Sequence, residues 1–164
     1  ISGRVEKFYS PQTASRQITA VVDYAHTPDS LKKLYEVFPN QQKICVLGNT
    51  GGGRDTWKRP EMAAIAERYC DHVILTNEDP YDEDPQKIIN EMAEGIKDKN
   101  KLTIEFDRRI AIEKALAMTP DGGVTLVSGK GTDPFIMGPD GTKESWSDAE
   151  VVQMLLTELP TITP

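Results

Sequence analysis

The sequence is poor in the residues that mark several classes of protein. It contains two cysteines and two histidines among 164 residues, and aromatic residues make up 7% of it. Two isolated cysteines cannot supply the closely spaced ligands of a zinc site or the framework of a disulfide-rich domain. No apolar run approaches the roughly 20 residues that cross a bilayer, and no basic-then-apolar leader is visible. We therefore expect no membrane partner and no signal peptide.

A surplus of basic residues is also missing. The chain has 19 lysines and arginines against 26 aspartates and glutamates, for a formal net charge of -7. Such a balance disfavours a nucleic-acid partner. The length and the hydrophobic content of 38% are typical of one soluble globular domain. We expect a cytoplasmic protein in which Cys45 and Cys70, each inside an apolar run, are buried as reduced thiols.

Apolar, strand-like runs alternate with helix-like segments along the chain. Strands are predicted at residues 17–23, 43–48, 72–76, 102–106 and 123–129. Helices are predicted at residues 30–38, 59–70, 85–97, 108–118 and 147–159, the last with Ser147 and Asp148 as candidate caps. Strands that are apolar on both faces and separated by helices indicate an α/β fold. We predict a Rossmann-like, mostly parallel sheet with helices on both faces.

Three segments lie outside this alternation. The stretch PFIMGPDGTKESW (134–146) predicts a short antiparallel hairpin at the edge of the sheet, with Pro-Asp-Gly as its turn. Residues 1–16 are polar and broken by Pro11, so we interpret them as a leading segment rather than a folded unit. The predicted division is therefore a leading segment at 1–16, one domain at 17–159 and a tail at 160–164.

Four unusual stretches each follow a predicted strand. They are DYAHTP (23–28), GNTGGGRD (48–55), NEDPYDEDP (77–85) and SGKGTD (128–133). In an open parallel sheet, ligands bind beyond the carboxyl ends of the strands. We therefore expect the four stretches to meet at one edge of the sheet and to form a site.

Each stretch also has a plainer interpretation when it is taken alone. GNTGGGRD matches neither GxxxxGK[ST] nor GxGxxG, and its Arg54 either binds a carboxylate or phosphate or pairs with Asp55 in solvent. The acidic loop either binds a metal or cation or is solvated, with Asp84 capping the next helix. Lys130 is either an anion ligand or an ordinary turn residue. A lone histidine such as His26 is more often structural than catalytic.

Taken in order, six stretches resemble the motifs of the Mur ligases, the ATP-dependent amide-forming enzymes of peptidoglycan precursor synthesis. SGRVEKF resembles the family's GRME-type stretch, DYAHTPD its best-known motif, and GNTGGGRDTWKRPEM its GxGGDRDxxKRPxM run. TNEDPYDEDPQKII is similar to TxDNPRxExPxxII, DRRIAI to DRxxAI and SGKGTD to GKGHE. Within the family, the resemblance is to the C-terminal domain of the branch that adds a diamino acid to UDP-N-acetylmuramoyl-L-alanyl-D-glutamate.

The resemblance implies roles for particular residues. Nucleotide contacts would come from Arg4, Asp23, Tyr24 and His26. Arg54 would bind the carboxylate of the incoming amino acid. Further contacts to that amino acid would come from Glu78, Asp79, Tyr81, Gly129, Lys130 and Asp133.

The resemblance also implies what this domain does not supply. It assigns no catalytic residue and no metal ligand to the chain. The reaction would require ATP and Mg²⁺. A central domain would carry the phosphate loop, the magnesium site and a carbamylated lysine, and residues 1–16 would connect that domain to this one. An N-terminal domain would bind the UDP-linked dipeptide. The chain alone would therefore be inactive as a ligase.

Two departures from the family motifs concern the amino acid that is selected. The arginine of DNPR, which the resemblance links to meso-diaminopimelate, is Tyr81 here, and Thr132 and Asp133 replace the histidine and glutamate of GKGHE. Tyrosine cannot pair with a second carboxylate, so these changes favour lysine or another basic diamino acid. Two alternatives stay open: a related cyanophycin or folylpolyglutamate synthetase domain, and a non-catalytic module that binds a nucleotide or an amino acid.

Overall fold

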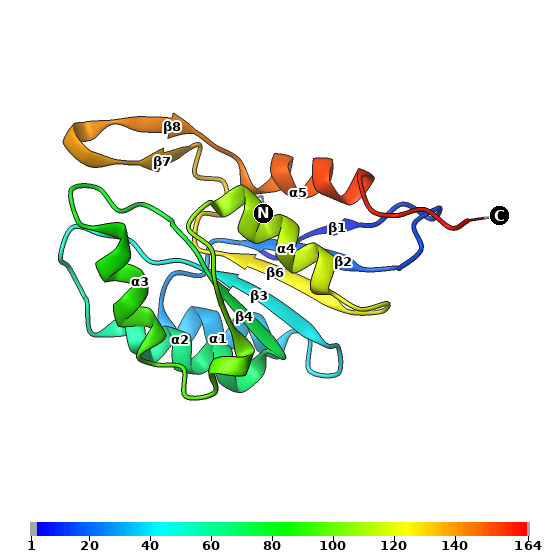
Figure 1. The fold of residues 1–164 in the computed structure, drawn as a ribbon, viewed down its shortest axis with the longest axis horizontal. Coiled ribbons are helices and arrows are strands. Elements are labelled where there is room, and N and C mark those ends of the chain that lie inside the picture. Colours follow the sequence, from blue (N-terminus) through cyan, green and yellow to red (C-terminus); the bar gives the residue numbers. More distant parts are fainter. Residues whose placement is uncertain (1–2, 164) are drawn as a thin grey trace.

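The computed structural model describes residues 3–163 as an α/β fold built on one large sheet (Figure 1). The sheet strands are β1 Glu6–Tyr9, β2 Thr19–Asp23, β3 Lys43–Leu47, β4 His72–Leu75, β5 Leu102–Ile104 and β6 Val124–Ser128. The α-helices are α1 Pro28–Glu36, α2 Lys58–Tyr69, α3 Pro85–Ala93, α4 Arg108–Met118 and α5 Asp148–Thr157. The hairpin strands are β7 Phe135–Met137 and β8 Lys143–Ser145, and the short 3₁₀ turns are η1 Lys99–Lys101 and η2 Pro139–Gly141.

The strand order of the sheet places the last strand in the middle. The order is β1-β2-β6-β3-β4-β5, and every neighbouring pair is parallel except β1 and β2. The chain therefore moves outward from β3 to β5 and then returns through α4 to insert β6 between β2 and β3. Such a reversal of direction opens a crevice at the carboxyl ends of the central strands.

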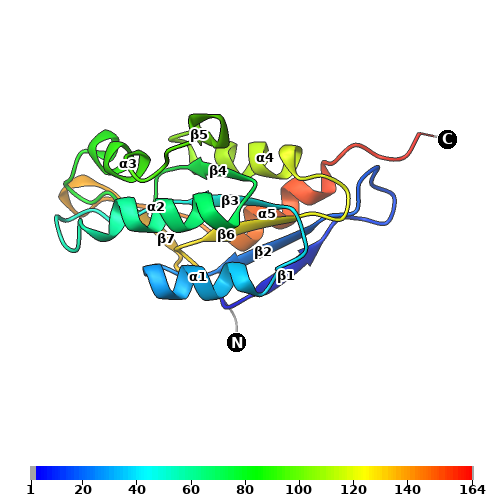
Figure 2. The ribbon, with the colours of Figure 1, turned by 90° about the horizontal axis from the view of Figure 1, so that it is seen from below.

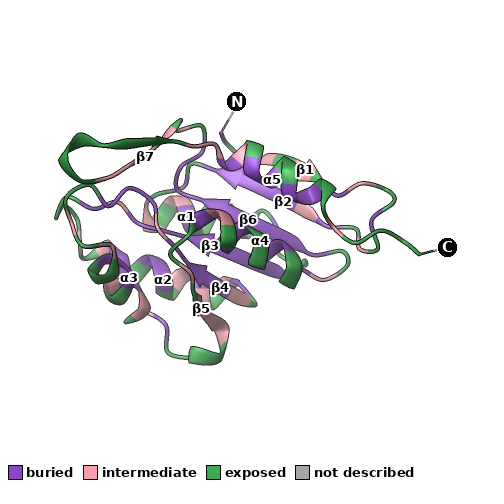
Figure 3. Cartoon of the chain, turned by 45° about the horizontal axis from the view of Figure 1, so that its top comes forward, coloured by how far each residue is buried: buried purple, intermediate pink, exposed green. Residues whose placement is uncertain are grey.

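Helices cover both faces of the sheet, as the sequence predicted. Figure 1 and Figure 2 show α1, α2 and α3 on one face and α4 and α5 on the other. Successive residues of β2 alternate between the two cores: Val21 packs with the first helix layer, and Ala20 and Val22 pack with the second. Figure 3 shows the central strands buried and the outer helix surfaces exposed.

Polar caps begin four of the five α-helices. The side chain of Thr27 caps α1 in a reciprocal arrangement with Ser30, and Asp84 caps α3 just before a proline, as predicted. Ser147 caps α5 by accepting a hydrogen bond from the Glu150 N–H. Asp148, the other predicted cap, is instead fully buried and paired with an arginine of α4.

Two predictions about the periphery need correction. Residues 6–9 lie within the leading segment that we interpreted as unfolded, yet they form β1, the antiparallel edge strand beside β2. Residues 134–146 do form a hairpin, but β7 and β8 make a separate two-stranded sheet and add nothing to the edge of the large one. The hairpin is held away from the edge because its backbone bonds to the acidic loop instead, where the N–H of Tyr81 donates to the carbonyl of Met137. The assignment of residues 1–16 to a preceding domain stays a prediction.

The expectation of reduced thiols is wrong in this structure, because Cys45 and Cys70 form a disulfide. Cys45 lies on β3 and Cys70 is the C-cap of α2, and their Cα atoms are 6.3 Å apart. Both belong to the core between the sheet and α1–α3. The crossover helix runs back over the strand that precedes it, so two cysteines far apart in sequence meet. No helix in the described part of the chain is both long and apolar enough to cross a bilayer.

Candidate functional site

The four stretches singled out in the sequence lie at one edge of the sheet, as predicted. They follow β2, β3, β4 and β6, which all run parallel. The strands end in step, since Asp23 pairs with Ser128 and Leu47 pairs with Leu75. The Lys58 ammonium also donates to the His26 carbonyl at 3.3 Å, which ties the start of α2 to the loop after β2.

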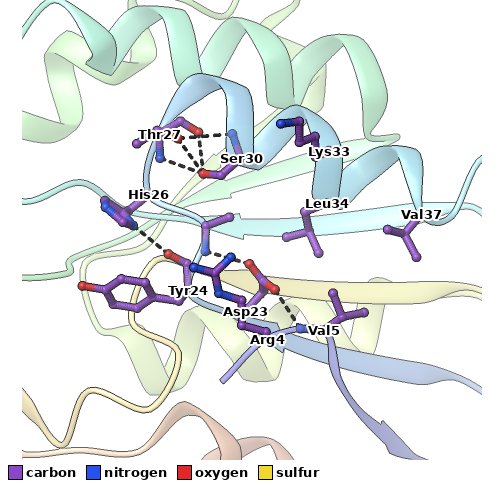
Figure 4. A pocket seen from close by; sticks show the side chains of 11 residues that line it. Arg4, Val5, Asp23, Tyr24, His26, Thr27, Ser30, Lys33, Leu34 and Val37 are labelled. Carbon is purple, nitrogen blue, oxygen red and sulfur yellow. Dashed lines mark hydrogen bonds between the residues drawn. The ribbon is translucent and has the colours of Figure 1, made fainter. Parts of the chain in front are cut away.

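A cavity of about 410 Å³ opens beside the end of β2. Its wall combines the start of the described chain, the loop after β2 and one side of α1 (Figure 4). All four residues predicted to contact a nucleotide line it. The lining residues are Arg4, Val5, Asp23, Tyr24, Ala25, His26, Thr27, Ser30, Lys33, Leu34 and Val37.

Within this cavity, the Asp23 carboxylate is already occupied by backbone donors. Its Oδ2 accepts from the Val5 N–H and its Oδ1 from the Ala25 N–H, both at 2.7 Å. Asp23 is 7% exposed, so its carboxylate fastens the start of β1 to the turn after β2. The aspartate at the end of this strand therefore has a structural role, because the turn needs a carboxylate to accept these two backbone N–H groups.

The aromatic groups at the cavity mouth pack on each other. The rings of Tyr24 and His26 meet edge to face with centroids 4.7 Å apart, and His26 Nδ1 lies 2.9 Å from the Tyr24 carbonyl oxygen. Tyr24 is 43% exposed, and Arg4 and His26 are exposed as well. The cavity mouth therefore offers two exposed aromatic rings, tilted against each other, with the cationic Arg4 beside them, which suits an aromatic, anionic ligand.

Three residues predicted to contact the amino acid form one cluster, in which Lys130 and Asp79 are buried and the Asp133 side chain is 34% exposed. The Lys130 ammonium, 1% exposed, lies 3.0 Å from both oxygens of Asp79 and 3.3 Å from Asp133 Oδ2. Asp79 Oδ1 also accepts from the Met137 N–H at 2.8 Å. The cluster thus joins the loops after β4 and β6 to the hairpin. In this structure Lys130 is engaged by carboxylates of its own chain.

Glu78 lies next to this cluster and faces Gly129. Its Oε1 accepts from the Thr50 hydroxyl at 3.2 Å, and the residue is 4% exposed. A Cβ at Gly129 would lie 2.6 Å from Glu78 Oε2, so only glycine allows this approach. Burial raises the pKa of the Glu78 carboxyl. Glu78 and Gly129, both predicted site residues, are therefore in direct contact.

Arg54 and Tyr81 are not drawn into that cluster. Arg54 is exposed, and within residues 3–163 its side chain forms no ion pair or hydrogen bond, including the pairing with Asp55 that we considered. Tyr81 is 39% exposed and has a left-handed backbone with a φ of 52°. Both side chains are therefore available to a ligand. They lie on adjoining loops, because the Gly51 N–H donates to the Asp79 carbonyl at 2.7 Å.

The sequence reasoning missed the buried arginines that hold these loops. Arg108, at the start of α4, donates to both oxygens of Asp148 at 2.8 Å. It also donates to the Asn77 carbonyl at 3.2 Å and the Ser128 carbonyl at 3.0 Å, at the ends of β4 and β6. Arg59, at the start of α2, likewise donates to a carboxylate, that of Glu83, and to a loop carbonyl, that of Thr50. Both arginines stand in stretches quoted above, Arg59 in GNTGGGRDTWKRPEM and Arg108 in DRRIAI, and this was the signal in the sequence that could have pointed to them.

Comparison with known proteins identifies the family. The family described as "Mur ligase, glutamate ligase domain" matches residues 3–131. This chain belongs to the Mur ligase family. A Mur ligase of Aquifex aeolicus, named UDP-N-acetylmuramoyl-L-alanyl-D-glutamate–2,6-diaminopimelate ligase, is 40% identical over 95% of this chain and 32% of its own. The ligase of the same name from Coxiella burnetii is 43% identical over 72% of this chain and 24% of its own.

Solved structures agree with the Mur ligase assignment. The structure of a UDP-N-acetylmuramoyl-L-alanyl-D-glutamate–2,6-diaminopimelate ligase superposes with a TM-score of 0.82 at 29% identity, over 95% of this chain and 31% of that one. Folylpolyglutamate synthase from Thermotoga maritima superposes with a TM-score of 0.56 at 16% identity, over 79% of this chain and 28% of that one. This likeness shows a shared fold only. The family and fold predicted from the motifs are confirmed. The chain spans about a third of the length of the curated relatives it matches.

Proposed function

We propose that this chain is the C-terminal domain of an ATP-dependent ligase that joins a diamino acid to UDP-N-acetylmuramoyl-L-alanyl-D-glutamate. The observation that carries the proposal is the 40% identity over 95% of the chain to a ligase named for this dipeptide. The remaining two thirds of such a ligase would hold the UDP-linked dipeptide. ATP and nucleotide-linked peptidoglycan precursors are made in the bacterial cytoplasm, so we propose that location for the whole enzyme.

The cavity beside β2 is the proposed contact surface for ATP. Tyr24 and His26 provide aromatic rings for the base to pack on, and Arg4 provides a cation for the ribose or phosphates. Asp23 would act by shaping the turn that carries Tyr24 and His26, since both of its oxygens are bonded to backbone. The described residues contain no group of three histidine, cysteine, aspartate or glutamate side chains able to hold a metal. We propose that the Mg²⁺ that accompanies ATP is held by the central domain of the whole enzyme, and no step assigned to this chain passes through it.

The proposed share of this domain is positioning. In the whole enzyme, ATP would phosphorylate the D-glutamate carboxylate and release ADP. The amine of the incoming amino acid would then attack the acyl phosphate, lose a proton and displace inorganic phosphate to leave an amide. Arg54, exposed on its loop, would bind the carboxylate of that amino acid and so aim its amine. Correct orientation alone can account for several kcal/mol of a barrier.

Among the diamino acids, two observations favour lysine over 2,6-diaminopimelate. Tyr81 stands where the family motif has arginine, and it cannot neutralise a second carboxylate. Asp79 and Asp133 both lie within hydrogen-bond distance of the Lys130 ammonium, so this lysine faces two carboxylates, an acidic setting that suits a distal ammonium. The relatives named above are diaminopimelate ligases, which makes that amino acid the competing candidate.

Steady-state kinetics of the full-length enzyme test both parts of the proposal. Arg54→Ala should raise the KM for the amino acid on the order of a hundredfold, because a charge-assisted bidentate contact is lost, while the KM for ATP changes little. An unchanged KM for the amino acid would remove Arg54 from the site. A panel of lysine, ornithine and meso-diaminopimelate should show a preference for a basic amino acid, and a clear preference for meso-diaminopimelate would defeat the lysine assignment. Absence of any ligase activity would favour a binding module.

A further inference from the structure

Arg59, in the first turn of α2, is completely buried and bonded on several sides. Its guanidinium donates to both oxygens of Glu83 at 2.8 Å and to Glu91 at 2.7 Å. It also donates to the backbone carbonyl of Thr50 at 3.2 Å. A buried guanidinium is tolerated only with such partners, so Arg59 fixes the relative places of α2, α3 and the loops after β3 and β4.

The loop of residues 48–55 is attached to this arginine a second time, through Glu83. Glu83 Oε2 accepts from the Gly53 N–H at 3.1 Å as well as from Arg59. A third attachment is direct contact with the acidic loop, where a Cβ on Gly51 would lie 1.9 Å from the Pro80 carbonyl oxygen. The loop backbone is thus held at residues 50, 51 and 53.

The loop needs these attachments because its own backbone does not specify its shape. Gly52, Gly53 and Asp55 have φ values of 95°, 73° and 49°, and the segment belongs to no helix or strand. Glycine populates many conformations almost equally, so a glycine-rich loop is ordered mainly by contacts to its surroundings. Arg54 directly follows the anchored Gly53, and its side chain forms no hydrogen bond or ion pair within the described residues.

From these contacts we infer that Arg59 and Glu83 are positioning residues for the amino-acid site. Together they hold the backbone of residues 50 and 53 so that Arg54 presents its guanidinium to the carboxylate of the incoming amino acid. Neither residue touches the substrate: Arg59 is buried, and Glu83 acts through the Gly53 amide. The inference rests on the proposed function, because it assigns a purpose to the exposed Arg54.

Glu91 provides a matched control within the same network. It binds the same guanidinium at 2.7 Å, but it lies on α3 and is not bonded to the backbone of residues 48–55. Glu83→Gln and Glu91→Gln each remove one negative charge next to Arg59. A purely structural role predicts that the two variants lose stability and leave substrate binding alone. A positioning role predicts that only Glu83→Gln alters binding.

The decisive experiment measures both variants in the full-length enzyme below their unfolding temperatures. For Glu83→Gln we expect the KM for the amino acid to rise on the order of tenfold, with the KM for ATP within about twofold of the wild type. For Glu91→Gln we expect both KM values to stay within about twofold of the wild type. Equal changes in the two variants, or an unchanged KM in Glu83→Gln, would overturn the inference.

A second measurement on the chain itself separates this inference from the proposed function. Amide hydrogen exchange at Gly53, followed by NMR, should be faster in Glu83→Ala than in Glu91→Ala, because only Glu83 accepts that N–H and alanine offers no acceptor. Equal exchange in the two variants would contradict the anchoring whatever the enzyme assay shows. If exchange differs but the full-length protein has no ligase activity, the anchoring is supported and the proposed function fails.

Discussion

Three positively charged side chains lie inside the molecule near the carboxyl edge of the sheet. Arg59, Lys130 and Arg108 are 0%, 1% and 3% exposed, and each is bonded to at least one carboxylate. Burying an unpaired charge is costly, so each carboxylate is needed for folding as much as for any site. All three cations bind residues of the loops that follow the strands. At the scale of single residues, charge pairing therefore sets the shape of the candidate site.

The pairing of Glu83 makes the stability of the chain depend on pH. The hydrogen bonds from the Arg59 guanidinium are the main reason that the pKa of Glu83 is lowered from an ordinary 4.5 to about 2. A carboxyl whose pKa is lower in the folded state stabilises the fold above its unfolded pKa and loses that effect as the pH falls toward its folded pKa. The Glu83 contribution should therefore be complete above about pH 5 and lost near about pH 2.

We expect Glu83→Gln to lower the free energy of unfolding by about 3 kcal/mol at neutral pH and by much less near about pH 2. Urea unfolding of the two proteins at a series of pH values measures this difference. Carboxylates that do not contact Arg59 titrate alike in both proteins and cancel in the comparison. A difference that stays constant with pH would show that Glu83 does not titrate with a depressed pKa.

At the scale of elements, hydrogen bonds join the loops at the carboxyl edge to one another and to the hairpin. The Gly51 N–H donates to the Asp79 carbonyl, and the Tyr81 N–H donates to Met137 on β7. The hairpin is fastened once more where the Asp140 N–H donates to Asp82 at 2.7 Å. The acidic loop is therefore hydrogen-bonded to the glycine-rich loop on one side and to the hairpin on the other, and one of its carboxylates, Asp82, accepts one of these bonds.

Gly51→Ala tests this packing. Its added Cβ would lie 1.9 Å from the Pro80 carbonyl oxygen, so the two loops must move apart. We expect the free energy of unfolding to fall by about 1–3 kcal/mol, the usual cost of overpacking a tight contact. Gly52→Ala is a useful comparison, because a Cβ there meets nothing within 4 Å and only its φ of 95° opposes the substitution. Wild-type stability in Gly51→Ala would contradict the contact between the loops.

For the whole molecule, one covalent bond joins parts of the core that are far apart in sequence. The disulfide between Cys45 and Cys70 encloses the glycine-rich loop and α2 within the segment it closes. Cys45 and Cys70 are 0% and 3% exposed, so reductants reach the bond only when the core opens. Disulfides are uncommon in the cytoplasm of most organisms, although the intracellular proteins of some hyperthermophiles contain many.

Thiol titration of the unfolded chain without reductant should find no free cysteine. Reduction should lower the free energy of unfolding by about 3 kcal/mol, since the bond closes a loop of moderate length in the unfolded chain. The double variant Cys45→Ala, Cys70→Ala should not respond to reductant, which controls for other effects of the reagent. Two titratable thiols in the freshly purified chain would restore our original expectation of reduced cysteines.

Local patterns in the sequence determined the class and order of the elements. The predicted strands and helices match β2–β6 and α1–α5 to within a few residues, because apolar periodicity, prolines and caps act over short distances. The same local stretches carried the family resemblance and predicted which loops share one edge, since parallel strands place their carboxyl ends together.

Only the tertiary structure decided which side chains meet within those loops. Four such contacts join residues that are distant in sequence: Arg59 with Glu83, Lys130 with Asp79, Cys45 with Cys70, and β1 with β2. No local pattern specifies such partners, because a charged residue or a cysteine is equally compatible with solvent until packing closes around it. The sequence thus determined where the candidate site lies, and the packing of its loops decided which polar side chains there are already bonded within the chain.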